Sequence, residues 1–166
     1  MKVLAYLSLG SNVGDREAHL RAALDRLLGL GKLIRVSSHY ETEPVEVTNQ
    51  AWFLNCAAAV ETDLGAAELL AGVLAIEQEM GRRRTELKGP RTIDIDILLF
   101  GNLVIDQVGL AIPHPSIAQR RFVLEPLSEI APDALHPLLR KTVRQLRDAL
   151  PPGQIVRRVE AGASEA

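Results

Sequence analysis

Hydrophobic positions along residues 3–100 change repeatedly between strand spacing and helix spacing. Two helices are predicted where leucines and other apolar residues recur every three or four positions, one beginning near Asp15 and the other over residues 66–80. Four apolar runs of strand length lie around them, at residues 3–9, 33–40, 52–61 and 92–100. The order β-α-β-β-α-β predicts an α+β fold of the ferredoxin-like type, with helices on one face of an antiparallel sheet.

The part of the chain after Gly101 is divided by prolines. Their spacing permits only short helices, which we predict at residues 121–130 and 143–150. We interpret this part as an elaboration of a single domain over residues 1–160, followed by a frayed tail at 161–166. Within the first part, the polar loop 41–50 is long for a compact domain, and loops of that length often carry function.

The composition excludes several classes of partner. A chain of 166 residues with a net charge of −2 has no overall attraction for nucleic acid or for an anionic membrane. No apolar run reaches the roughly 18 residues that a bilayer-spanning helix needs. Cys56, the only cysteine, lies in an apolar run and is interpreted as a buried structural thiol, which excludes a disulfide framework. We expect a soluble, cytoplasmic monomer that binds neither nucleic acid nor membrane.

Two carboxylates stand in the apolar run at residues 92–100. Side chains two positions apart on a strand point to the same face, so Asp94 and Asp96 would lie side by side while the isoleucines between and beside them enter the core. Oxygen ligands of this kind suit Mg²⁺, which completes its coordination with substrate phosphates and water. By spacing alone, an exposed, salt-bridged pair at a sheet edge is the favoured interpretation, so the metal hypothesis needs support from the neighbouring residues.

A cluster of cations precedes this pair. Within ten residues the chain carries Arg82, Arg83, Arg84, Lys88 and Arg91. Guanidinium groups bind phosphate oxygens in pairs of hydrogen bonds and keep their charge, although many such runs are only a solvated face. Next to a candidate metal site, the cluster favours a polyphosphate-binding enzyme. The glycine patterns of P-loop and Rossmann enzymes are absent from the sequence. His114, held between two prolines, is a further candidate ligand, with a structural role as the alternative.

The segment from Gly89 to Gly101, GPRTIDIDILLFG, resembles the signature of the 6-hydroxymethyl-7,8-dihydropterin pyrophosphokinase family. The resemblance extends over roughly residues 3–130. It includes Leu9-Gly10-Ser11-Asn12, Ser37-Ser38-x-Tyr40-Glu41-Thr42-x-Pro44, Phe53-Leu54-Asn55 and Ile112-Pro113-His114-Pro115.

This resemblance implies ATP as donor, AMP and a pterin diphosphate as products, and two Mg²⁺ ions held by Asp94 and Asp96. It implies that Arg82, Arg84 and Arg91, together with Asp96, are catalytic. The ATP-binding residues that it implies are Glu77 near the adenosine, Arg82, Arg84 and Arg91 in the catalytic loop and its hinge, and His114 and Arg120 at the phosphates.

The resemblance also implies a pterin site. Phe53 and Phe122 would sandwich the ring, because stacking holds a planar heterocycle, and the Asn55 amide would read its edge. The other implied pterin-binding residues are Asp94 and the segment with Thr42, Pro44 and Val45, which would contribute mostly backbone contacts.

Some positions depart from the family pattern. Lys88 stands where a tryptophan is typical, in a loop that is one residue shorter; Pro115 replaces a tyrosine and Leu74 a glutamine. Two other functions remain open on sequence grounds: a ferredoxin-like ligand-sensing module without catalysis, and a metal-dependent phosphodiesterase. Release of AMP from ATP, measured with and without the pterin, distinguishes the three.

Overall fold

An antiparallel sheet of six strands organises the chain, which the computed structural model describes at residues 2–43, 51–81 and 92–159. Along its main path the order is β10 (Val156–Arg158), β3 (Tyr40–Thr42), β4 (Phe53–Thr62), β1 (Val3–Ser11) and β5 (Asp94–Phe100), and β2 (Lys32–Val36) also pairs with β4. The first and last strands of the β-α-β-β-α-β unit, β1 and β5, therefore lie next to each other. The predicted α+β, ferredoxin-like arrangement is confirmed.

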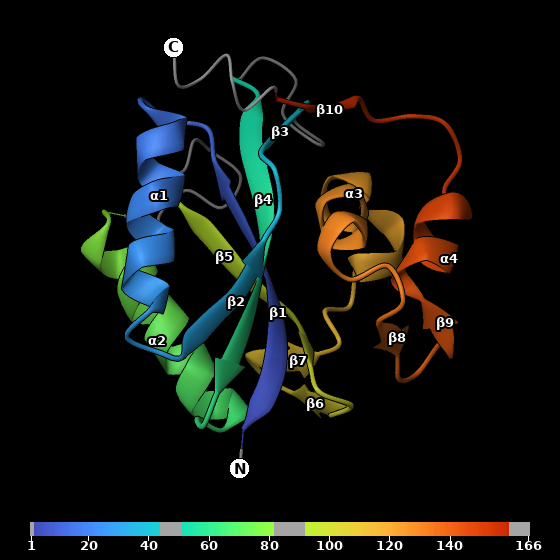
Figure 1. Cartoon of the computed structure of the whole chain (residues 1–166), viewed down its shortest axis with the longest axis horizontal. Coiled ribbons are helices and arrows are strands. Elements are labelled where there is room, and N and C mark those ends of the chain that lie inside the picture. The colour runs from blue at the N-terminus through green and yellow to red at the C-terminus, as the bar shows by residue number, and fades with distance from the viewer. Residues whose placement is uncertain (1, 44–50, 82–91, 160–166) are drawn as a thin grey trace.

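Helices α1 (Arg16–Leu27) and α2 (Ala66–Glu79) cover one face of this sheet (Figure 1). The predicted start of α1 is confirmed, because the Asp15 carboxylate accepts a hydrogen bond from the Ala18 amide at 3.1 Å and caps the helix. The leucines predicted to share one face of α1 pack in the core with the stripe of α2 and with alternate residues of β1, β4 and β5. This core fixes which side chains of the strands point to the opposite face.

The opposite face is covered as well, which corrects the expectation of helices on one face only. Helices α3 (Arg121–Ile130) and α4 (Val143–Asp148), with the short 3₁₀ helix η1 (Ile117–Gln119), pack there in a second core (Figure 1). The small side chains of Ala57 and Ala59 allow α3 to approach β4. A strand buried on both faces loses the polar alternation that would have revealed the second layer.

The prediction of a single strand at residues 33–40 is wrong, because two strands, β2 and β3, occupy this region. Strands β2 and β3 are separated around Ser37, whose amide donates to the Ala57 carbonyl at 2.9 Å and whose hydroxyl accepts from the Ala57 amide at 2.8 Å. The Ala57 amide thus donates to the Ser37 side chain instead of to a backbone carbonyl, so the backbone hydrogen bonds between the strands are interrupted there. The predicted loop 41–50 is also corrected, because Glu41 and Thr42 belong to β3. Residues 44–50 lie outside the described part.

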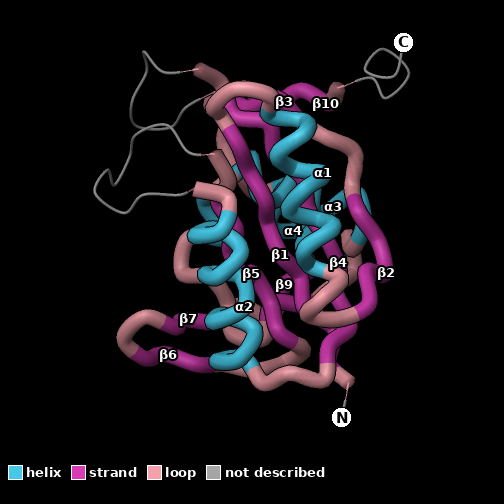
Figure 2. The backbone as a smooth tube through the Cα atoms, turned by 90° about the vertical axis from the view of Figure 1, so that its left-hand side faces the viewer, coloured by secondary structure: helices cyan, strands magenta, loops and turns pink. Residues whose placement is uncertain are grey.

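The C-terminal half contains strands that the proline spacing did not predict. A hairpin of β6 (Ile105–Gln107) and β7 (Leu110–Ile112) projects from one end of the molecule (Figure 2). A second small sheet pairs β8 (Leu135–His136) with β9 (Lys141–Thr142), and β10 joins the main sheet. The predicted helix at 121–130 is confirmed, whereas the one predicted at 143–150 ends at Asp148. None of the helices in the described ranges has the length and apolarity to cross a membrane.

The partly exposed carboxylate of Glu129 joins α3 to the start of β3. Glu129 accepts hydrogen bonds from the Ser38 amide at 3.0 Å, the Ser38 hydroxyl at 3.1 Å and the Tyr40 hydroxyl at 2.7 Å. Burial by itself would raise the pKa of Glu129, but these hydrogen bonds, with Arg158, bring the pKa below its usual 4.5. The same contacts and burial raise the pKa of Tyr40. The carboxylate form therefore stabilises the fold.

We predict that Glu129→Gln lowers the free energy of unfolding at pH 7 by about 1.5–3 kcal/mol, because charged hydrogen bonds are lost. Since the folded-state pKa is lowered, the contribution of Glu129 is complete above about pH 4.5 and is lost as the pH falls below that value. Urea unfolding at pH 7 and at pH 3.5 checks this, and the variant should differ from wild type much less at pH 3.5. Glu79→Gln, at an exposed ion pair with Arg26, is the matched control. Equal behaviour of the two variants would contradict the prediction.

Candidate functional site

Asp94 and Asp96 lie on the face of β5 that is turned away from α1 and α2. Ile93, Ile95 and Ile97 are buried in the core on the other side, so the predicted alternation is confirmed. Both aspartates are partly exposed, and the Asp96 side chain keeps 35% of its accessible surface. They share this face with α3, which means that the end of the second helical layer lies beside the candidate metal site.

Strand register places two rows of residues across this face. Gly10 of β1 pairs with Asn55 of β4 on one side and with Asp94 of β5 on the other. Two residues earlier in β1, Ser8 pairs with Asp96 of β5. Small side chains thus occupy the central strand, with the aspartates on one flank and Asn55 on the other.

Asn55 is held in one orientation by its neighbours and is only 4% exposed. Its Oδ1 accepts a hydrogen bond from the Thr42 hydroxyl at 2.6 Å, and its Nδ2 donates to the Leu9 carbonyl at 3.4 Å. A Cβ atom at Gly10 would overlap Asn55 Nδ2, so only glycine leaves room for this amide. The absence of a side chain at Gly10 is therefore a condition for the position of Asn55.

His114 reaches toward the aspartates from the segment after β7. Its backbone amide donates to the Leu98 carbonyl at 3.0 Å, and its Nδ1 accepts from the Ser116 amide at 3.1 Å. Nε2 lies 4.0 Å from Asp96 Oδ1. Burial lowers the pKa of His114 and the Arg120 guanidinium lowers it further, while Asp94 opposes them. With its pKa lowered, the ring is uncharged at neutral pH. Because Nδ1 accepts a hydrogen bond, the proton is on Nε2, which can donate a hydrogen bond on the side of Asp96.

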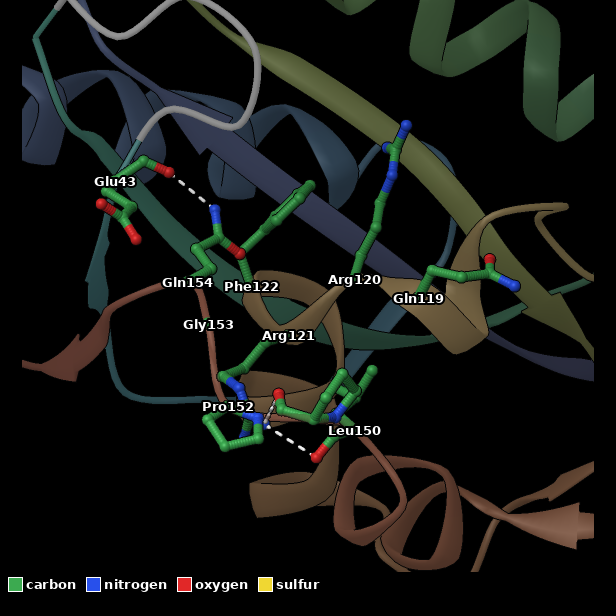
Figure 3. Close-up of a pocket in the computed structure, with 10 residues that line it drawn as sticks. Glu43, Gln119, Arg120, Arg121, Phe122, Leu150, Pro152, Gly153 and Gln154 are labelled. Carbon is green, nitrogen blue, oxygen red and sulfur yellow. Dashed lines mark hydrogen bonds between the residues drawn. The ribbon is translucent and has the colours of Figure 1, made fainter.

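Arg120 and Phe122 stand at the start of α3. The Arg120 guanidinium lies over the Phe122 ring, 5.5 Å from its centroid. Figure 3 shows both side chains extending from the beginning of the helix, away from Leu150 and Pro152. A residue predicted to bind phosphate and one predicted to stack on the pterin are therefore neighbours. Phe53, on β4, belongs to the same face of the sheet, beside Gly10.

Glu77 has a place that sequence reasoning did not anticipate. It is 2% exposed, and its Oε2 accepts a hydrogen bond from the Ile95 amide at 2.7 Å. Ile95 lies between the two aspartates, so α2 holds the backbone of the candidate metal site. The sequence contains a signal for this, because Glu77 follows Val73 by four positions and thus falls within the apolar stripe of the helix. Its predicted contact with adenosine stays a prediction.

Several predicted residues fall outside the described part of the chain. They are Pro44 and Val45 of the pterin segment, and Arg82, Arg84, Lys88 and Arg91 of the basic cluster. Within the described ranges, no three or more histidine, cysteine or acidic side chains gather as a metal cage. The two aspartates fit Mg²⁺ nevertheless, because that ion commonly takes one or two carboxylates and fills its shell from phosphates and water.

Comparison with known proteins gives consistent matches. A family model described as 7,8-dihydro-6-hydroxymethylpterin-pyrophosphokinase matches residues 6–132. A Bacillus subtilis protein named 2-amino-4-hydroxy-6-hydroxymethyldihydropteridine pyrophosphokinase is 48% identical, over 78% of this chain and 79% of its own. A Methylorubrum extorquens protein of the same name is 41% identical, over 92% of this chain and 97% of its own.

Longer proteins also match. The chain is 42% identical to the folic acid synthesis protein fol1 of Schizosaccharomyces pombe, of which it spans only 20%. A crystal structure of a Plasmodium falciparum HPPK-DHPS protein superposes with a TM-score of 0.73 at 21% identity, over 89% of this chain and 44% of that one. At this identity the likeness supports the fold alone. The matching regions are therefore one part of these larger proteins.

Proposed function

The chain belongs to the 7,8-dihydro-6-hydroxymethylpterin-pyrophosphokinase family, and we propose how its residues divide the work of the family's reaction. That reaction, a step of folate biosynthesis, transfers a pyrophosphoryl group from ATP to the hydroxymethyl group of 6-hydroxymethyl-7,8-dihydropterin. One observation carries the assignment of roles: Asp96, His114 and the Arg120–Phe122 pair converge at one end of a single sheet face.

Asp94 and Asp96 would hold the metal, which we propose to be two Mg²⁺ ions bound together with ATP. When bound, Mg²⁺ neutralises charge on the phosphates and orients them. Asp94 also lies in the same row as Asn55, which supports its second predicted role at the pterin. Gly10 between them leaves room for the Asn55 amide.

The phosphates would be bound by His114 and Arg120, with Arg82, Arg84 and Arg91 as further predicted catalytic cations. The hydroxymethyl oxygen forms a bond to the β-phosphorus of ATP, and the bond from that phosphorus to the oxygen of the α-phosphate breaks, so AMP leaves. The hydroxyl proton is lost in this step, and a water-mediated contact to Asp96 is one route for it. Neutral His114 serves as a hydrogen-bond donor through Nε2.

The pterin would lie between Phe53 and Phe122, with its edge toward Asn55. Thr42 fixes the Asn55 amide by donating its hydroxyl to Oδ1, so we assign the Thr42 side chain an orienting role. Stacking provides affinity for any flat heterocycle, whereas the fixed amide provides selection. These two roles, stacking and selection, explain why aromatic side chains and an amide lie on the same face of the sheet.

An assay of AMP release tests the function directly. ATP and Mg²⁺ are supplied with and without 6-hydroxymethyl-7,8-dihydropterin, and AMP should form only with the pterin, together with pterin diphosphate. A ligand-sensing module would bind these molecules without forming AMP. A phosphodiesterase would cleave a chromogenic phosphodiester and would show no dependence on the pterin.

We predict that His114→Ala lowers kcat about a hundredfold, because a positioned donor to the phosphates is lost. His114→Asn retains an acceptor for the Ser116 amide and should keep the local fold without recovering the rate. Steady-state kinetics and thermal unfolding of both variants check this. A wild-type kcat in either variant would contradict the proposed role of His114 in the reaction.

A further inference from the structure

Strand β10 lies beyond residues 6–132, which the family model matches, and it pairs with β3, the strand that carries Thr42. Val156 pairs with Thr42 in the antiparallel ladder. Just past this pair, three hydrogen bonds surround Glu43: its amide donates to the Ile155 carbonyl at 3.1 Å, its Oε1 accepts from the Ile155 amide at 2.7 Å, and its carbonyl accepts from Gln154 Nε2 at 2.6 Å. The end of β3 is therefore fixed by the C-terminal segment.

The same segment contacts the start of β4. The Arg157 guanidinium lies over the Trp52 ring, 5.2 Å from its centroid. Trp52 immediately precedes Phe53, the predicted stacking residue, and its carbonyl accepts a hydrogen bond from Arg16 at 3.0 Å. Residues 154–157 thus hold Glu43 on one side and Trp52 on the other, next to two predicted pterin-binding positions.

The chain just before this segment contacts α3. Arg121 donates from Nη2 to the Pro151 carbonyl at 3.1 Å and from Nη1 to Glu125 at 3.1 Å. Arg121 and Pro151 line a cavity of about 360 Å³, and its lining also includes Glu43, Phe122 and Gln154. Figure 3 shows the Gln154 side chain between Glu43 and Phe122, with a hydrogen bond to the former. Phe122, the second predicted stacking residue, therefore shares a cavity wall with the C-terminal segment.

We propose that residues 154–157 form a positioning segment for the pterin side of the site, and that Gln154 and its partner Glu43 are the positioning residues. The proposal rests on the proposed function. The segment acts through its neighbours: it fixes β3, and with it Thr42, which orients Asn55, and it holds Trp52 beside Phe53. Changes in the segment consequently alter the use of the pterin, while the aspartates and His114, on the other flank of the face, keep their arrangement.

Variants of Glu43 and Gln154 test this. Glu43→Ala removes the acceptor for the Ile155 amide, whereas Glu43→Gln retains a side-chain carbonyl there. Gln154→Ala removes the donor to the Glu43 carbonyl. In the AMP-release assay, Glu43→Ala and Gln154→Ala should each raise the KM for the pterin about tenfold. Values of kcat and of the KM for ATP should stay within about twofold of wild type, and Glu43→Gln should restore the pterin KM.

Gln107→Ala, on the exposed hairpin strand β6, is the matched control and should change none of these constants. Calorimetric titration of the pterin into enzyme with a non-hydrolysable ATP analogue measures the same effect without turnover. An unchanged pterin KM and affinity in both alanine variants overturns the proposal. A fall in both kcat and the unfolding temperature of the alanine variants also overturns it, because the segment would then serve only the stability of the fold. Failure of wild type to form AMP would instead overturn the proposed function, and the titration still decides the role of the segment.

Discussion

Replacing Asp96 with alanine is expected to lower kcat at least about a thousandfold, with little change in the free energy of unfolding. The side chain is partly exposed and faces away from the main core, so its removal leaves no cavity there. What the substitution would remove is the oxygen ligand that we propose for Mg²⁺, and with it the neutralisation of charge as the pyrophosphoryl group is transferred. Higher Mg²⁺ concentration should not restore the rate fully, because the ligand itself is gone.

Asp106→Ala provides the control, because it removes an exposed carboxylate from the β6–β7 hairpin at the edge of the molecule. AMP release measured over a range of Mg²⁺ concentrations should be the same for Asp106→Ala and wild type. Activity of Asp96→Ala within tenfold of wild type, with an unchanged dependence on Mg²⁺, would refute the metal role of this aspartate. A parallel measurement of thermal unfolding excludes loss of the fold as the cause.

Gly10→Ala is expected to lower kcat/KM for the pterin at least about a hundredfold. The new Cβ would overlap Asn55 Nδ2, so the amide must leave its hydrogen bonds with Thr42 and with the Leu9 carbonyl. A site that recognises its substrate by a buried amide loses far more from misplacing that amide than from losing a methylene contact. The KM for ATP should change much less, because Asp96 and His114 lie on the other flank of Gly10.

A double-mutant cycle with Asn55→Ala separates this cause from a general disturbance of β1. If Gly10→Ala acts through Asn55, it should add less than about threefold once Asn55 is already alanine. Gly29→Ala is the matched control, because a Cβ there meets only the Arg26 carbonyl at ordinary contact distance, 3.5 Å. Full additivity of the two losses would show that Gly10 and Asn55 act independently and would contradict the prediction.

Local periodicity was enough to predict the elements that carry the site. The alternation around Asp94 and Asp96, the helix start near Asp15 and the leucine stripes each depend on residues a few positions apart, and all are present in the structure. The resemblance of the signature segment then predicted the family, which the family model confirms. The role of Glu77 was within reach of the same reasoning, since a carboxylate in an apolar stripe requires a buried partner.

The sequence alone thus determined the main helices and strands of residues 3–100, apart from the break at Ser37, and the face that each aspartate takes. Only the tertiary structure decided which residues share a row across the sheet, that α3 covers the aspartate face and so brings Arg120 and Phe122 to it, and that β10 returns to pair with β3. The physical reason is distance along the chain. Helix and strand periodicity depend on near neighbours, whereas register and layer order depend on packing between segments up to about a hundred residues apart, for which one sequence holds no repeating signal.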